Sequence, residues 1–292
     1  MIPFEMAEPA SLQEALAMLD PQEPAIRPVS GGTALMLMMK AGVFRPTRLV
    51  SLHRLAPEHA RVAMNGSGEF RIGALATLSE LEHDRNIAAR LPALKRALRT
   101  LSNPRVRNVA RLGGALAHGD PHMDLPPMLA ALAARVSIAG PNGTREVPLA
   151  ELYTGYYETV LERNELITAV TVPPLGGRQA AYVKVTARSA DDWPALGIAV
   201  SFLLKDGAVH DPVVVVSAAT EKVTRLSGAE RLLHGGRLDN QLLRHAGDAA
   251  AKEAILLTDA HGSAGYKREL LRVYLGRAMR QAAGSRPGAQ QS

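Results

Sequence analysis

Cysteine is absent from this sequence of 292 residues. Without a thiolate the chain cannot form a disulfide, bind zinc through cysteine or hold an iron–sulfur cluster through cysteine ligands. If the protein takes part in iron–sulfur chemistry, a partner polypeptide must therefore supply the cluster.

A nucleic acid partner is not expected, although the chain carries a formal net charge of +6. Aromatic residues make up only 4% of the sequence, and none is interleaved with its one dense basic cluster. The stacking surface on which single-stranded bases bind is therefore missing. We interpret the cluster as a solvated face or a surface for a protein partner. Its members are Arg96, Arg99, Arg105, Arg107 and Arg111.

Long hydrophobic runs are also missing. No apolar stretch approaches the roughly 18 residues that a membrane-spanning helix needs. The opening MIPFEMAEPA has neither the basic segment nor the apolar segment of a secretion signal. We therefore expect a cytoplasmic protein without a transmembrane segment.

Length and patterning predict two domains of mixed α and β structure, an α+β fold. The Pro-Pro-Leu-Gly-Gly stretch at residues 173–177 resembles a linker, so we place the domains at residues 1–176 and 177–292. After it, three strand-like runs at 181–187, 196–204 and 208–217 predict a three-stranded antiparallel sheet, followed by helices.

Local signals place the other elements. Capping-box patterns at Ser11/Glu14, Thr77/Glu80 and Ser227/Glu230 predict three helix starts. An amphipathic helix is expected over 86–101, an irregular loop over 111–127 and a helix over 128–134. Further predictions are a helix at 33–40, strands at 27–29, 48–52, 70–73 and 165–172, and a hairpin of 135–139 with 145–147.

Two paired-glycine turns are the candidate ligand-binding segments. Gly31 and Gly32 lie between a predicted strand and a predicted helix, where the backbone can approach a phosphate closely. Gly113 and Gly114 open the predicted loop over 111–127. Each turn alone is a weak signal, since neither matches the Walker or the Gly-x-Gly-x-x-Gly pattern. Two such turns suggest a ligand with two phosphates.

A metal site is the alternative interpretation of the second turn. His118, Asp120, His122 and Asp124 have side chains that suit zinc, iron or manganese. However, Gly119 and Pro121 interrupt any helix that would set the two imidazoles side by side, and no third histidine is nearby. We favour hydrogen bonding within the loop or contact with a ligand.

The order of these motifs resembles the FAD-binding medium subunits of molybdenum hydroxylases, such as those of the carbon monoxide dehydrogenase family and the FAD-binding domain of xanthine dehydrogenase. The resemblance covers nearly the whole chain. It is carried by Ser30-Gly-Gly-Thr33, Asn103 to Asn108, Leu112-Gly-Gly114, Ala117-His-Gly-Asp-Pro121 with Asp124, Gly140 to Gly143, Glu165-Leu-Ile167, Lys184, Arg188 and Asp192-Trp193.

The resemblance implies FAD held across two α+β subdomains, with the two glycine turns around the pyrophosphate. We expect the hydrogens of Gly32 and Gly114 to face it. Asp124 would bond ribityl or ribose hydroxyls, Ile167 would pack near the adenine, and Lys184 would approach the isoalloxazine ring. The full set of implied cofactor-binding residues is Val29, Ser30, Gly31, Gly32, Thr33, Ala34, Arg111, Leu112, Gly113, Gly114, Ala115, Asp124, Ile167 and Lys184.

The implied function is electron transfer through FAD, within a complex that has a molybdenum cofactor-binding large subunit and a [2Fe-2S] small subunit, assembled as a dimer of heterotrimers. Three residues depart from the family pattern: Ala34, Arg111 and Ala115 stand where the family has hydroxyl, amide or acidic side chains. Arg111 would either bind phosphate or turn to solvent. Two other interpretations stay open, an assembly subunit without FAD and a stand-alone flavin oxidoreductase.

Overall fold

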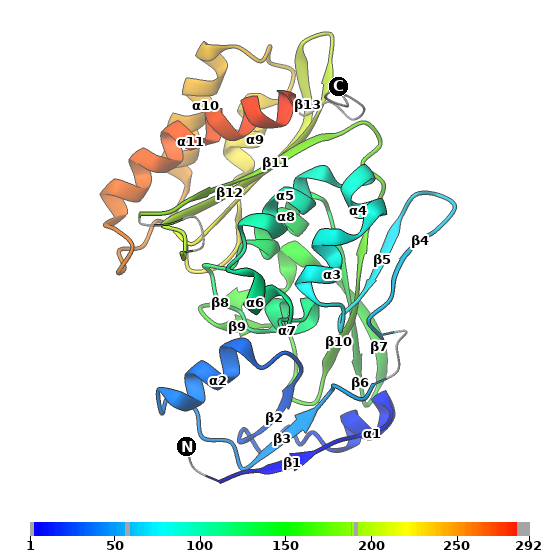
Figure 1. Ribbon diagram of the computed structural model, residues 1–292. Coiled ribbons are helices and arrows are strands. Elements are labelled where there is room, and N and C mark those ends of the chain that lie inside the picture. Colours follow the sequence, from blue (N-terminus) through cyan, green and yellow to red (C-terminus); the bar gives the residue numbers. More distant parts are fainter. Residues whose placement is uncertain (1–2, 56–58, 188, 190–191, 285–292) are drawn as a thin grey trace.

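The computed structural model describes residues 3–55, 59–187, 189 and 192–284. Arg188, one of the residues that carry the resemblance, lies outside the described residues. The chain forms three regions in sequence order, which stack from bottom to top in Figure 1. Its mixture of helices and sheets confirms the predicted α+β class.

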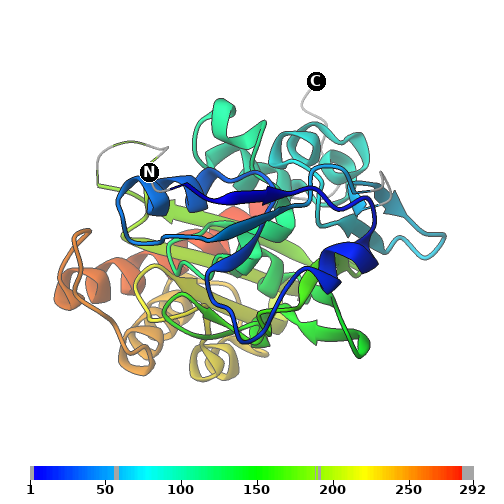
Figure 2. The ribbon, with the colours of Figure 1, turned by 90° about the horizontal axis from the view of Figure 1, so that it is seen from below.

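A small parallel sheet with the strand order β1-β3-β2 forms the first region. Figure 2 views the molecule from the side of this sheet, whose strands cross in front of the rest of the chain. Its core is a small apolar cluster, which Leu166 of the next region joins. The elements are β1 (Glu5–Ala7), α1 (Leu12–Ala17), β2 (Ile26–Val29), α2 (Thr33–Lys40) and β3 (Arg48–Ser51).

The second region is a five-stranded antiparallel sheet, β4-β5-β10-β6-β7, with helices on one side. Its strands are β4 (Val62–Met64), β5 (Phe70–Gly73), β6 (Arg135–Gly140), β7 (Gly143–Pro148) and β10 (Leu166–Val172). Its helices are α3 (Leu78–His83), α4 (Arg85–Arg90), α5 (Pro92–Thr100), α6 (Pro104–Arg107), α7 (Leu112–Ala117) and α8 (Leu125–Ala131). A 3-10 turn (Leu149–Glu151) and a two-stranded hairpin, β8 (Tyr153–Gly155) with β9 (Glu158–Thr159), complete it.

The third region is an antiparallel sheet covered by helices on both faces. Helices α9, α10 and α11 lie on one face, while α5 and α8 of the second region lie on the other. The predicted three-stranded meander is present, and a short fourth strand pairs with its last member. The elements are β11 (Gln179–Val185), β12 (Leu196–Lys205), β13 (Ala208–Ser217), β14 (Thr224–Arg225), α9 (Ser227–Leu233), α10 (Asn240–Glu253) and α11 (Ala264–Gly284).

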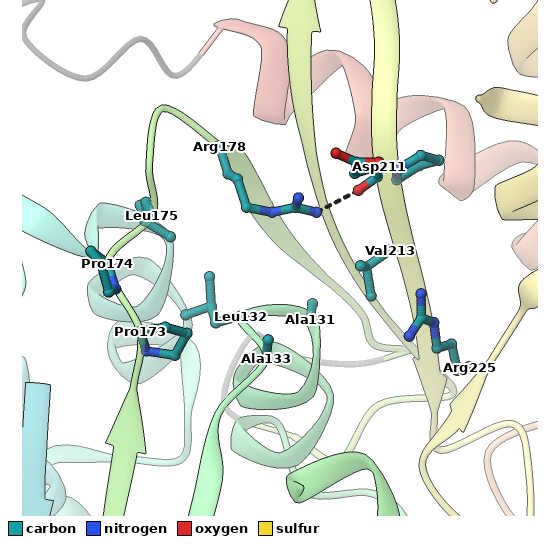
Figure 3. A pocket seen from close by; sticks show the side chains of 11 residues that line it. Ala131, Leu132, Ala133, Pro173, Pro174, Leu175, Arg178, Asp211, Val213 and Arg225 are labelled. Atoms are coloured by element: carbon teal, nitrogen blue, oxygen red, sulfur yellow. Dashed lines mark hydrogen bonds between the residues drawn. The ribbon is translucent and has the colours of Figure 1, made fainter. Parts of the chain in front are cut away.

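Arg178 fixes the chain where it enters this sheet. Its guanidinium donates to the carbonyl of Ser201 at 3.2 Å, to the Ser201 hydroxyl at 3.1 Å and to the carbonyl of Asp211 at 2.5 Å. Figure 3 shows the side chain reaching from the linker across to Asp211. One arginine thus ties the start of β11 to β12 and β13.

The predicted helix over 86–101 is wrong, because two helices with a break at Leu91 occupy this stretch. Pro92 has no N–H and disfavours helical backbone in the residue before it. Leu91 accordingly has φ −127° and ψ 56°, outside the helical region. The amphipathic pattern continues across the break because α4 and α5 bury their apolar faces in the same core.

The predicted irregular loop over 111–127 is also wrong in part, since it contains α7 and the start of α8. Local glycine and proline signals hid α7, whose first turn is held by tertiary contacts. The N–H of Leu112 donates to the carbonyl of Ala76 at 3.0 Å, and the N–H of Gly113 to that of Ala74 at 2.8 Å.

The third capping box is wrong, whereas the one at Thr77 is confirmed with both of its bonds. Ser227 is the first helical residue of α9, and its side chain does not cap the helix. Glu230 turns instead into the protein, where it accepts from the N–H of Val214 at 2.9 Å and from Arg225 at 2.8 Å. At Ser11 the hydroxyl caps α1, while Glu14 bonds the N–H of Ala10.

We predict that Thr77→Ala lowers the free energy of unfolding by about 2 kcal/mol, at the upper end for a helix cap, because the site is buried. Ser11→Ala should cost only about 0.5 kcal/mol, since that cap is exposed. Urea unfolding of both variants tests this. Equal losses of unfolding free energy in the two variants would show that burial of the Thr77 cap adds nothing to stability.

A candidate cofactor cleft

One cleft of about 710 Å³ runs between the first two regions and the edge of the third. This volume falls in the range of cofactor pockets. All of the predicted site residues line the cleft except Leu112. The side chain of Leu112 is buried in the main apolar core and its N–H is bonded to Ala76.

The first glycine turn presents the start of α2 to this cleft. Gly32 has φ +67°, a left-handed conformation that glycine adopts without strain, and it precedes the first helical residue. No side chain caps the helix. The N–H groups of Thr33, Ala34 and Leu35 have no carbonyl partner within the helix, so its partial positive charge faces the cleft that these residues line.

The two glycine turns lie close together, and close backbone packing explains three of the four glycines. A Cβ atom on Gly31 would collide with the backbone of Val109 and Ala110. A Cβ on Gly113 would lie 2.7 Å from that of Ala74, and one on Gly114 would lie 3.0 Å from Oγ of Ser30. Only glycine permits so close an approach of the turns and of β5.

That a hydrogen of Gly32 faces the ligand stays a prediction, but a side chain at this position would point toward other side chains of the protein. A Cβ there would point at the side chains of Val29 and Met36, both 3.5 Å away. Gly32 is needed for its backbone conformation. Gly114 is the glycine whose hydrogen faces the space between the turns, opposite Ser30.

Arg111 lies on the cleft wall, immediately before α7. Its Nη1 donates to the carbonyl of Leu75 at 2.6 Å, so the guanidinium is held against the wall. In the described part of the chain Arg111 forms no ion pair. A half-buried cation with only a neutral partner is suited to bind an anion.

Asp124 and Lys184 form a buried ion pair at one end of the cleft. Lys184 Nζ lies 3.1 Å from Oδ2 of Asp124 and also donates to the carbonyl of Thr100 at 3.0 Å. The hydroxyl of Tyr182 donates to the other carboxylate oxygen. Burial raises the pKa of Asp124 above its usual value, against the opposing effects of Lys184 and Tyr182.

Comparison with known proteins identifies the family of the chain. Residues 2–175 match the family described as FAD binding domain in molybdopterin dehydrogenase, and residues 181–282 match the CO dehydrogenase flavoprotein C-terminal domain. The chain is a molybdenum hydroxylase flavoprotein. FAD is its cofactor, and its relatives are subunits of oxidoreductase complexes.

The similarity extends over whole chains. The carbon monoxide dehydrogenase medium chain of Hydrogenophaga pseudoflava is 33% identical over 97% of this flavoprotein and 98% of the relative. The solved structure of that organism's enzyme superposes with a TM-score of 0.92, covering 97% of this chain and 99% of that one. The glyceraldehyde dehydrogenase medium chain of Sulfolobus acidocaldarius is 28% identical over 96% and 98% of the two chains. No described helix of the flavoprotein is long and apolar enough to cross a membrane.

Ile167 also lines the cleft. It belongs to β10, next to a bulge in that strand's pairing with β6, and is 9% exposed. Leu52, Leu161 and Leu166 also line the cleft and are apolar. This part of the cleft can enclose a flat, weakly polar group such as adenine.

The histidines and acids of residues 118–124 bond with one another and with the last region. Nδ1 of His122 lies 3.1 Å from Asp120, and Nε2 lies 3.1 Å from Asp259. Asp259 also accepts from Lys267 at 2.6 Å. No group of three or more residues among the described ones has the arrangement of a metal site. No motif predicted the involvement of Asp259 and Lys267, because they lie far along the chain.

Aromatic side chains close this end of the cleft, and sequence reasoning missed one of them. The Trp193 ring lies 5.8 Å from that of His122. The Tyr157 ring lies 5.1 Å from that of His118, edge to face. Tyr157 has φ +59°, and its N–H bonds the carbonyl of Gly119, so the hairpin tip is fixed against the 118–124 loop.

A second pocket of about 310 Å³ lies away from the cleft, between the linker and β13 (Figure 3). None of the predicted site residues lines it. Its polar members are Arg178, Asp211 and Arg225, which serve the strand contacts described above. The larger cleft is therefore the candidate cofactor site.

We predict that Lys184→Met lowers the free energy of unfolding by about 3–5 kcal/mol, because it leaves the buried Asp124 carboxylate without a cation. The double variant with Asp124→Asn should recover part of that loss. Lys252→Met, at an exposed position in α10, is the control. Denaturant unfolding measures all three, and a loss at Lys184 no larger than at Lys252 would contradict the ion pair.

Proposed function

We propose that this flavoprotein is the medium subunit of a heteromeric molybdenum hydroxylase and passes electrons from a partner's [2Fe-2S] clusters through FAD to an external acceptor. One observation carries the proposal. A single cleft gathers both glycine turns, Arg111, the Asp124–Lys184 pair and Ile167, from segments that are far apart in the sequence.

The cleft suits a long dinucleotide with different groups at its two ends. The middle would hold the pyrophosphate, where the open first turn of α2, Gly114 and Arg111 supply hydrogen-bond donors and positive charge. The apolar end at Ile167 would take the adenine. Asp124 and Lys184 offer an acceptor and a cation for the ribityl chain and the ring. Ala34 and Ala115 cannot add side-chain hydrogen bonds, so the backbone and Arg111 must do more of the binding.

FAD, when bound, supplies the redox chemistry. The chain's own residues bind and orient it, and the buried Asp124–Lys184 pair keeps that part of the wall rigid. Neither a nucleophile nor a general acid is required for this function.

The partners follow from what this chain lacks. It has no cysteine, so any [2Fe-2S] cluster must belong to another subunit, and we place the clusters in a small subunit and the molybdenum cofactor in a large one, as the resemblance implies. The relatives are named for carbon monoxide, glyceraldehyde and nicotine as substrates, although their chains are similar throughout. We infer that the substrate is selected by the large subunit, within a cytoplasmic dimer of heterotrimers.

Experiments can distinguish two other functions from the proposed one. Ala34, Arg111 and Ala115 favour an assembly subunit that has lost FAD, and a purified chain without flavin absorbance would support it. A stand-alone flavin oxidoreductase would turn over its substrate without partners. Co-purification with a cysteine-rich small subunit and a molybdenum subunit would exclude the stand-alone enzyme.

We predict that Gly114→Val abolishes FAD retention while the fold persists. Its side chain would occupy the space between the glycine turns, since even a Cβ lies 3.0 Å from Ser30 Oγ. Gly265→Val, in the exposed first turn of α11, is the matched control and should keep its FAD. Absorbance at flavin wavelengths together with circular dichroism measures both. Full FAD content in Gly114→Val would refute the placement of the pyrophosphate.

We predict that Arg111→Ala weakens FAD binding by about one to two orders of magnitude, because a charged hydrogen bond contributes roughly 1.5–3 kcal/mol. Arg111→Thr should lose less, since a hydroxyl can still donate. Arg105→Ala removes an exposed arginine of the same cluster, outside the cleft, and should bind normally. Titration of apo-protein with FAD compares them, and equal dissociation constants would mean that Arg111 does not bind phosphate.

A further inference from the structure

Four charged side chains connect the cleft wall to helix α11. Asp120 bonds Nδ1 of His122 at 3.1 Å, Nε2 of His122 bonds Asp259 at 3.1 Å, and Asp259 accepts from Lys267 at 2.6 Å. Asp120 is 2% exposed and Lys267 is 0% exposed, so solvent does little to stabilise their charges. Two carboxylates and two cations balance here only when His122 is protonated.

The geometry around His122 requires both of its ring protons. A neutral imidazole has one N–H and one lone pair, so one ring nitrogen would face a carboxylate without a proton between them. Burial by itself would lower the pKa of His122, but the hydrogen bonds and charges of Asp120 and Asp259 outweigh burial and raise it. For the neighbouring His118, burial is the larger effect and lowers the pKa.

His122 lies at the end of the cleft that suits the redox ring. Asp120 and His122 line the cleft together with Asp124, Lys184 and Trp193. This end combines an aromatic wall with hydrogen-bonding groups, as a flat ring with polar edges needs. The lining near Ile167 includes the apolar Leu161 and Leu166 and the charged Glu165.

We infer that His122 holds a fixed positive charge beside the redox end of the cleft and stabilises the negative charge that the flavin ring gains on reduction. The inference rests on the proposed function. Uptake of two electrons and one proton by neutral oxidised flavin leaves a net charge of −1 on the ring. The electrons would come from the partner's [2Fe-2S] clusters in the complex, or from dithionite in a titration.

A purely structural role does not call for this charge. The 118–124 loop is already tied to the last region by a backbone bond of 2.8 Å from Ala218 to Pro121. Lys267 has a second partner, the carbonyl of Ala218, at 3.1 Å. The hydrogen-bonded side chains from Asp120 to Lys267 place a cation, His122, at the cleft wall. The fully buried Lys267 holds the other end of this group.

The test compares His122→Gln, which removes the charge, with His122→Lys, which keeps it. Each full-length chain is loaded with FAD and titrated with dithionite beside a reference dye. In His122→Gln, reduced FAD should bind at least about tenfold more weakly relative to oxidised FAD, which lowers the midpoint potential by about 30 mV. His122→Lys should stay near the wild type. His261→Gln, a nearby histidine outside the cleft lining, should also leave the potential unchanged.

A second measurement is made on the wild-type protein. Because coupling between two sites is reciprocal, reduction of the flavin must raise the pKa of His122 in the wild type by the same factor. Titration of isotope-labelled histidine by NMR in both redox states measures this, with His122→Lys used for assignment. This measurement decides the matter if His122→Gln fails to fold or to retain FAD.

The outcomes separate the two proposals. Equal potentials in the wild type and in an FAD-loaded His122→Gln, or an unchanged His122 pKa on reduction, would overturn the role of His122 and leave FAD binding intact. A wild-type chain that does not bind FAD would instead overturn the proposed function.

Discussion

The contact between the two glycine turns is the constraint on which the cleft depends. Gly31 lies against the backbone of Val109 and Ala110, so a side chain there would force the first two regions apart, and Gly113 lies against Ala74, so a side chain there would push α7 away from the end of β5. This contact brings the start of α2 opposite the start of α7. Because the N–H groups of Leu112 and Gly113 are bonded to the strand connection at Ala74 and Ala76, the second turn is a rigid wall.

The buried charges along this wall lie in matched groups of opposite sign, as a low-dielectric interior favours. Asp124 is matched by Lys184, and Asp120 and Asp259 are matched by His122 and Lys267. Buried charges in such matched sets cost little more than neutral groups when their hydrogen bonds are complete. Arg111 differs, because its partner is the neutral carbonyl of Leu75. A bound pyrophosphate would supply the anionic partner that Arg111 lacks among the described residues.

Local chemistry made much of the fold predictable. The helix at 33–40, the strand at 70–73, the Thr77 cap and the meander are set by capping and alternation within a few residues, and the structure has them. One failure is local, because Pro92 breaks the expected helix at Leu91, and the others originate in tertiary contacts. Helix α7 forms despite its glycines because Ala74 and Ala76 hold its first turn, and Glu230 leaves its expected cap to satisfy the N–H of Val214. Likewise, all predicted site residues except Leu112 line the cleft, but no local pattern reveals Tyr157 on its lining or Asp259 and Lys267 behind it.

The last region contributes residues to the cleft, although it follows the other two regions in the sequence. Tyr182 and Lys184 of β11 reach Asp124, and Trp193 stands before β12 beside His122. The main apolar core likewise includes Ala180, Tyr182 and Val215 together with residues of the second region. The linker at residues 173–177 therefore divides the sequence without dividing the core. Because the redox end is built from both sides of that linker, a movement of the last region would change the surroundings of the flavin ring before it reached the pyrophosphate.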